Sequence, residues 1–238
     1  MIVCRALFVT RRRFGYIPVT IIGQDVTASK RLFSLQNIAC LRGGRVLFQN
    51  LSASVGAGDL LHLAGANGSG KTSLLRIMAG ALPPAAGEVL WDGKDFLENG
   101  AGHHNSRFSF LPSDDRALKV LETCGENLEF WNAIAGGSAN IDRALAAMDM
   151  TKLKTRAVKY LSAGQRRRLS LSRVLLKPAV LWLLDEPFNG LDAEAAGLFR
   201  AALDAHIASG GMAVIASHHT IDPPKQGALY RLEPGSFT

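Results

Sequence analysis

The glycine-rich stretch 65–72 has the residue types and spacing that bind nucleotide phosphates. It reads Gly-Ala-Asn-Gly-Ser-Gly-Lys-Thr, follows a short apolar stretch and precedes a predicted helix. In such a loop the backbone N–H groups surround the phosphates, the lysine reaches the outer phosphates and the threonine hydroxyl binds Mg²⁺. The helix N-terminus adds positive partial charge. The predicted phosphate-binding residues are Gly65, Ala66, Asn67, Gly68, Ser69, Gly70, Lys71 and Thr72.

Two acidic residues follow the apolar stretch 180–184, which we predict to be a buried strand. Asp185 would then project at the carboxyl edge of the sheet, where ligands bind in open α/β folds. There it is predicted to hold Mg²⁺ together with Thr72, and Glu186 to orient or deprotonate an attacking water. Taken alone, an ordinary polar strand end explains this pair as well.

A histidine follows the apolar stretch 212–216, which predicts another strand of the same sheet. The neutral imidazole of His218 could hydrogen-bond a terminal phosphate or the attacking water. We therefore predict catalytic roles for His218, Glu186 and Lys71. The adjacent His219 is expected to be a loop residue.

The spacing of apolar residues predicts the elements that position these groups. Strands are expected at 35–41, 46–55, 59–64, 87–91, 180–184 and 212–216, and helices at 72–80, 126–134, 141–148, 165–176 and 193–208. This alternation predicts an α/β fold with a mainly parallel core sheet and an N-terminal antiparallel β part. The more polar region at about 96–165 is expected to be an inserted helical subdomain.

The basic charge of the chain is concentrated at its beginning. Residues 1–31 hold six basic residues and one acidic residue, a net charge of +5, whereas residues 32–238 hold 21 basic and 19 acidic residues, a net charge of +2. The leader 1–31 is interpreted as an organellar transit peptide, a misassigned start or a basic tail. Attraction to a membrane surface explains this positive charge as well as binding to DNA does. We expect no nucleic-acid partner.

Apolar runs and cysteines limit the class of protein further. The strongest apolar run, residues 179–184, is far shorter than the roughly 20 residues of a membrane-spanning helix. Cys4, Cys40 and Cys124 are widely spaced and form no CxxC pair. The sequence therefore predicts neither a membrane span, a disulfide framework nor a structural zinc site, and favours a reducing compartment.

A second stretch narrows the class of nucleotide-binding protein. Residues 161–165, Leu-Ser-Ala-Gly-Gln, resemble the LSGGQ signature of ATP-binding-cassette (ABC) ATPases, with Ala163 in place of a glycine. They precede the Asp185-Glu186 pair by about twenty residues, as in that family. The resemblance covers residues 32–222. It implies a P-loop NTPase of the ABC type, with ATP and Mg²⁺ as cofactors.

The resemblance also implies that two copies pair. In the family, the signature faces the ATP held by the partner subunit in a head-to-tail homodimer. Residues 188–192 look like the family's D-loop, which implies that Asp192 lies at the dimer seam. An alternative is that Ser162 merely caps a helix. The residues implied to contact the partner's ATP are Leu161, Ser162, Ala163, Gly164 and Gln165.

Four further stretches are similar to the ATP-binding subunit of the cytochrome c maturation heme exporter: 87–91, 126–131, 165–168 and 181–188. This implies integral membrane permease subunits as partners, and heme and a heme chaperone as indirect ones. It also implies a location at the cytoplasmic face of the inner membrane, or in mitochondria if the leader is a transit peptide. Another ABC transporter ATPase and a soluble ABC ATPase remain alternatives.

The chain departs from the family pattern at two positions. Residues 113–116 read Ser-Asp-Asp-Arg where most members have a glutamine, and Asp115 is the nearest positional match and a candidate Mg²⁺ ligand. No aromatic residue near Arg42 is placed to stack on adenine. We expect the Arg42 guanidinium to take that role by stacking its plane on the base.

Overall fold

The computed structural model describes residues 32–96, 107–176 and 178–232. The leader 1–31 and the first part of the expected helical subdomain, 97–106, lie outside the described residues, so the proposed division of the chain stays a prediction. Within the described ranges, no helix combines the length and apolar character needed to cross a membrane.

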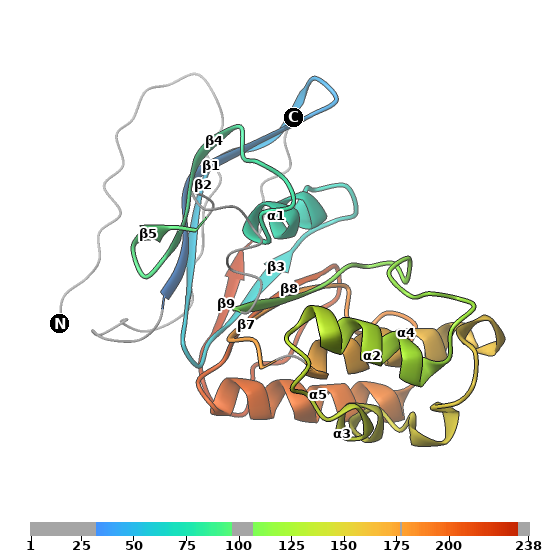
Figure 1. Cartoon of the computed structure of the whole chain (residues 1–238). Helices are drawn as coiled ribbons and strands as arrows, with labels where there is room; N and C mark the ends of the chain where they lie inside the picture. The colour runs from blue at the N-terminus through green and yellow to red at the C-terminus, as the bar shows by residue number, and fades with distance from the viewer. Residues whose placement is uncertain (1–31, 97–106, 177, 233–238) are drawn as a thin grey trace, which may run out of the picture.

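Two β-sheets and a layer of helices make up the described part of the chain (Figure 1). An antiparallel sheet has the order β2-β1-β4-β5: β2 (Arg45–Gly56), β1 (Leu32–Arg42), β4 (Ala86–Trp91) and β5 (Lys94–Asp95). A parallel sheet has the order β6-β7-β8-β3-β9: β6 (Phe108–Leu111), β7 (Leu181–Asp185), β8 (Met212–Ser217), β3 (Leu60–Ala64) and β9 (Leu229–Leu232).

Helices cover both faces of the parallel sheet. In Figure 1, α1 (Lys71–Met78) lies between the two sheets, whereas the other helices gather on the opposite side. These are α2 (Cys124–Ile134), α3 (Ile141–Ala147), α4 (Ala163–Leu176) and α5 (Ala193–Ala208), with short 3₁₀ turns η2 (Thr151–Leu153) and η3 (Val158–Tyr160).

Each central strand alternates between two hydrophobic cores. Along β7, Leu181 and Leu183 pack with α1 and the antiparallel sheet, whereas Trp182 and Leu184 pack with the helices on the opposite face. Successive side chains of a strand point to opposite faces, so a strand buried on both sides must be apolar throughout. This explains the uninterrupted apolar run before Asp185.

The predicted fold class is confirmed, and three strands were not predicted. The strand β6 falls inside the region interpreted as helical, and pairs in parallel with β7. The core sheet therefore continues into this region before the helices begin. The other two, β5 and β9, have only two and four residues, which give little periodicity.

Two of the three cysteines belong to the described part of the chain. Cys40 and Cys124 are buried free thiols, and burial raises the pKa of both. Cys4 lies outside the described residues.

The close pairing of β4 with β1 requires a glycine at position 87. Gly87 has a φ of +87°, and a Cβ there would lie 2.3 Å from the carbonyl oxygen of Gln36. Gly93, in the β4–β5 turn, has a similar φ of +75°, but apart from its two chain neighbours no described residue has an atom within 4 Å of its Cβ position.

Gly87→Ala is expected to lower the free energy of unfolding by about 3 kcal/mol or more, because backbone strain is added to a steric clash. Gly93→Ala is the matched control and should cost about 1 kcal/mol, from backbone strain alone. Urea denaturation measures both. Equal losses for the two variants would contradict the close approach.

Candidate nucleotide-binding site

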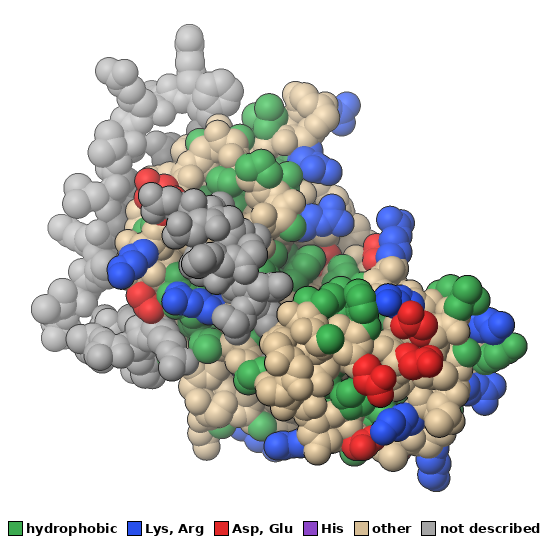
Figure 2. All heavy atoms as spheres, in the orientation of Figure 1, with side chains coloured by type: hydrophobic (Ala, Val, Ile, Leu, Met, Phe, Trp, Pro, Cys, Tyr) green, Lys and Arg blue, Asp and Glu red, His purple; other side chains and the backbone are tan. Residues whose placement is uncertain are grey.

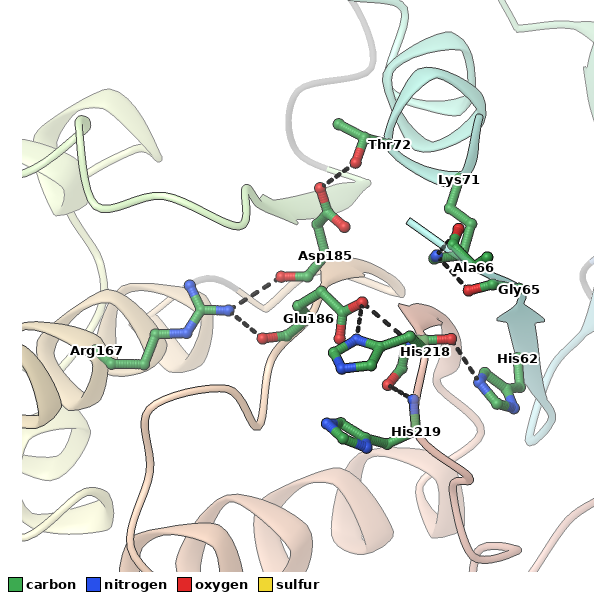
Figure 3. A network of polar contacts seen from close by, with 11 residues as sticks. His62, Gly65, Ala66, Lys71, Thr72, Arg167, Asp185, Glu186, His218 and His219 are labelled. Atoms are coloured by element: carbon green, nitrogen blue, oxygen red, sulfur yellow. Dashed lines mark hydrogen bonds and ion pairs between the residues drawn. The ribbon is translucent and has the colours of Figure 1, made fainter. Parts of the chain in front are cut away.

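The functional groups meet at one edge of the parallel sheet. Ala64 at the end of β3 pairs with Ser217 of β8, and Asp185 at the end of β7 pairs with Ala216. The segments that follow these strands therefore leave the sheet side by side, as Figure 3 shows. The phosphate-binding loop, the acidic pair and His218 lie together because the three strands are parallel and in register.

The glycine-rich loop encloses the end of its own lysine side chain. Lys71 is buried, and its Nζ donates hydrogen bonds to the carbonyl oxygens of Gly65 (2.6 Å) and Ala66 (2.9 Å). Gly70 has a φ of +90°, and a Cβ there would lie 3.0 Å from the ring of Phe48. The hydroxyl of Ser69 is buried without a hydrogen-bond partner among the described residues. The loop is thus an electropositive cradle that fits an anion with hydrogen-bond acceptors.

A buried carboxylate lies opposite the loop. Thr72 Oγ1 donates to Asp185 Oδ2 at 2.8 Å, and the Ser113 hydroxyl also hydrogen-bonds this carboxylate. Burial raises the pKa of Asp185, and these two hydrogen bonds and the charge of Lys71 oppose the rise. A carboxylate beside two hydroxyls is a set of hard oxygen donors, which fits Mg²⁺.

A cavity of about 320 Å³ joins the loop to the acidic pair. Three of the residues that line it were not predicted: Leu47, an apolar residue of β2, Ser73, which follows Thr72 in α1, and Ser113, which follows β6. Its lining consists of Leu47, Asn67, Gly68, Gly70, Lys71, Thr72, Ser73, Ser113, Asp185 and Glu186.

Arg42 and Asp115, which were predicted to contact the nucleotide and the metal, do not line this cavity. Arg42 pairs with Arg45 at the tip of the β1–β2 hairpin and is exposed. Asp115 Oδ1 accepts a hydrogen bond from Ser170 Oγ at 3.0 Å. The carboxylate of Asp115 is thus held by helix α4, and Ser113 occupies the position beside Asp185.

Glu186 and His218 form a hydrogen-bonded pair (Figure 3). Glu186 Oε1 accepts from the backbone N–H of His218 at 3.1 Å and lies 2.9 Å from its Nδ1. The backbone of Glu186 is left-handed, with a φ of +47°. The ring of His219 lies against that of His218, with 3.8 Å between the centroids. The predicted catalytic pair is thus assembled within one chain.

The signature residues lie apart from this cavity. Ser162 Oγ accepts from the N–H of Gln165 at 3.1 Å, and Gln165 Oε1 accepts from the N–H of Ser162 at 3.0 Å. This reciprocal pair is a capping box, so Ser162 does cap helix α4. Ser162 and Ala163 are exposed, and Leu161 is buried in the core. None of the five signature residues lines the chain's own phosphate-binding cavity.

The predicted D-loop packs against the start of α4. A Cβ on Gly164 would lie 3.3 Å from the carbonyl oxygen of Gly190. Asp192 caps α5 by accepting from the N–H of Ala195 at 2.8 Å, and its other oxygen accepts from Arg168 at 2.7 Å. The signature and the D-loop therefore form one connected surface.

Arg167 is a residue of the site that sequence reasoning missed. The residue is 4% exposed, and its side chain donates to the carbonyl oxygens of Asp185 (3.0 Å) and Glu186 (2.6 Å). Burial lowers the pKa of Arg167. In sequence it is one of three successive arginines on a basic helix. One pattern in the sequence could have identified it: Arg167 lies four and seven residues before the apolar Leu171 and Val174, a spacing that places Arg167 on the buried face of the helix.

Comparisons with known proteins agree with this geometry. A family model described as ABC transporter matches residues 48–189. A protein of Paramagnetospirillum magneticum named cytochrome c biogenesis ATP-binding export protein CcmA is 43% identical, over 85% of this chain and 94% of its own length. A protein of the same name from Methylococcus capsulatus is 42% identical, over 79% of this chain and 91% of its own length.

Solved structures show the same fold. An ABC transporter ATP-binding protein from Pyrococcus furiosus superimposes with a TM-score of 0.72 at 20% identity, over 84% of this chain and 97% of that one. The ATP-binding subunit of another ABC transporter gives the same TM-score and identity, over 79% of each chain. The chain belongs to the ABC transporter family, as an ATP-binding subunit that hydrolyses ATP.

Proposed function

We propose that this chain drives a membrane complex that serves heme delivery in cytochrome c biogenesis. The observation that carries this proposal is the similarity to relatives named for that process over more than nine-tenths of their length. As an ATP-binding subunit of an ABC transporter, the chain pairs with a second such subunit and acts on membrane partners. Heme and a heme chaperone are proposed as indirect partners, and the cytoplasmic face of the inner membrane as the location.

ATP is proposed to bind in the cavity at the sheet edge. Its phosphates would replace the two carbonyl oxygens as partners of Lys71, and the N-terminus of α1 would face them. Thr72 and Asp185 would hold Mg²⁺, with Ser113 beside them; the ion neutralises charge on the phosphates. Leu47 offers an apolar contact at the same cavity.

Glu186 is proposed to orient and deprotonate the water that attacks the terminal phosphate. Its carboxylate is at the cavity wall and is held by His218, whose imidazole also contacts the phosphate region in this proposal. Little covalent chemistry is left to protein groups in phosphoryl transfer, so catalysis consists of positioning and charge stabilisation. Lys71 supplies positive charge inside the loop.

The site of one chain is proposed to be completed by a second copy. The capped N-terminus of the 14-residue helix α4 is exposed at Ser162, outside the lining of its own chain's cavity. A helix N-terminus of this kind binds phosphate. We infer that Ser162 and Gly164 contact the ATP held by the partner copy, with Asp192 at the seam.

A second cavity is proposed to receive a membrane subunit. It has a volume of about 330 Å³ and lies between β6 and the helices α2 and α4. Trp131 and Ile134 line it, and Arg173 stacks on Trp131 at 4.5 Å. Figure 2 shows hydrophobic side chains gathered where α2 meets the sheet, and interspersed acidic and basic side chains over the helices. An apolar hollow beside surface charges of both signs suits a protein partner better than nucleic acid.

Glu186→Gln is expected to retain ATP affinity within about twofold and to reduce the hydrolysis rate by at least about 100-fold, because an amide cannot accept the proton of water. A fluorescent ATP analogue and phosphate release measure the two quantities. Glu129→Gln is the control, since it makes the same change at an exposed position of α2 outside the cavity lining. Steady-state hydrolysis at the normal rate by Glu186→Gln would remove Glu186 from this role.

Loss of the gene is expected to abolish covalent heme attachment to c-type cytochromes while b-type cytochromes persist. Heme staining of denaturing gels and reduced-minus-oxidised spectra distinguish the two. The wild-type chain should restore attachment, and Glu186→Gln at equal abundance should not. Normal c-type cytochromes in the deletion strain would refute the heme role and leave the ATPase assignment intact.

A further inference from the structure

The buried guanidinium of Arg167 joins two segments that line the nucleotide cavity. Its Nη2 donates to the carbonyl oxygens of Asp185 and Glu186, at 3.0 and 2.6 Å, and its Nη1 donates to that of Pro112 at 3.1 Å. These three acceptors come from the end of β7 and from the loop after β6. One side chain of α4 therefore fixes both segments to each other (Figure 3 shows the contacts with β7).

The first segment carries Glu186, the carboxylate that is proposed to activate the attacking water. Glu186 adopts a left-handed backbone, an arrangement that an L-residue holds only when its surroundings enforce it. Its N–H donates to Ala216 O at 2.8 Å and its carbonyl accepts from Arg167, so both ends of the residue are held. The side chain is thereby aimed at His218.

The second segment carries Ser113, whose hydroxyl contacts Asp185. Pro112 precedes it and is bound by Arg167 directly. Asp115 follows it, with its Oδ1 4.0 Å from Nη1 of Arg167 and in a hydrogen bond with Ser170. The loop on either side of Ser113 is therefore attached to the same face of α4.

We propose that Arg167 is a positioning residue for ATP hydrolysis, which holds Glu186 in the orientation that activates water. The inference rests on the proposed role of Glu186. An arginine is required because its planar fork donates in several fixed directions, whereas a lysine ammonium is a compact charge on a flexible stem. The neighbouring arginines have other partners, since Arg166 donates to Leu161 O and Arg168 pairs with Asp192.

Arg167→Lys and Arg167→Met in the full chain test this role. Both variants should bind a fluorescent ATP analogue, and show a KM for ATP, within about twofold of wild type. Their kcat should fall by about 10- to 100-fold, the effect of a displaced catalytic group. Thermal denaturation reports the folded fraction, and the lysine variant retains the positive charge beside Asp115.

Arg200→Lys is the matched control. Arg200 also donates to two successive carbonyls, those of Asp222 and Pro223, but from α5 and outside the cavity lining. Its kcat should stay within about twofold of wild type.

Two results would overturn the proposal. One is a kcat within about twofold of wild type for both Arg167 variants; the other is a loss of kcat matched by an equal loss of ATP affinity or of folded protein. Either result leaves the proposed function standing if Glu186→Gln is inactive. An active Glu186→Gln variant would instead remove the proposed role of Glu186, on which this inference rests.

Discussion

The parallel, in-register pairing of β3, β7 and β8 is the constraint on which the site depends. Ala64 pairs with Ser217, and Asp185 with Ala216, so the three strands end at one edge. A slip of one residue would turn every side chain of a strand to the opposite face and exchange the two hydrophobic cores. The same apolar pattern that buries the sheet therefore also places the phosphate-binding loop beside the carboxylates.

Each charged group of the site has hydrogen-bond partners within the chain. Lys71 donates to two carbonyls, Asp185 accepts from two hydroxyls and Arg167 donates to three carbonyls. A buried charge without such partners would be strongly destabilising. On binding, the phosphates would replace the carbonyl oxygens as hydrogen-bond partners of Lys71. The hydrogen bonds of Arg167 are made to backbone carbonyl oxygens and can persist. In this account Lys71 changes its hydrogen-bond partners when the nucleotide binds, whereas Arg167 keeps its own.

Local patterns predicted most of the fold and the central residues of the site. The glycine-rich loop, the acidic pair and the histidine each follow an apolar stretch, so their common edge follows from parallel strand order. Positions that depend on the path of a loop were not predictable in this way. Asp115 matches the family position in sequence, yet the turn after β6 directs it to Ser170 and brings Ser113 to the cavity. Leu47 rather than Arg42 reaches the cavity for a similar reason, because the hairpin extends Arg42 beyond it.

Whether two copies share each nucleotide is the central claim about function. Asn67 in the loop and Ser162 at the tip of α4 are both exposed in the single chain. The direct measurement mixes an Asn67→Cys copy with a Ser162→Cys copy, both hydrolysis-deficient and with Cys4 replaced, and follows disulfide formation on a non-reducing gel. We predict a cross-linked dimer that requires both copies and ATP. The absence of that dimer at saturating ATP, or its formation regardless of nucleotide, would contradict the shared site.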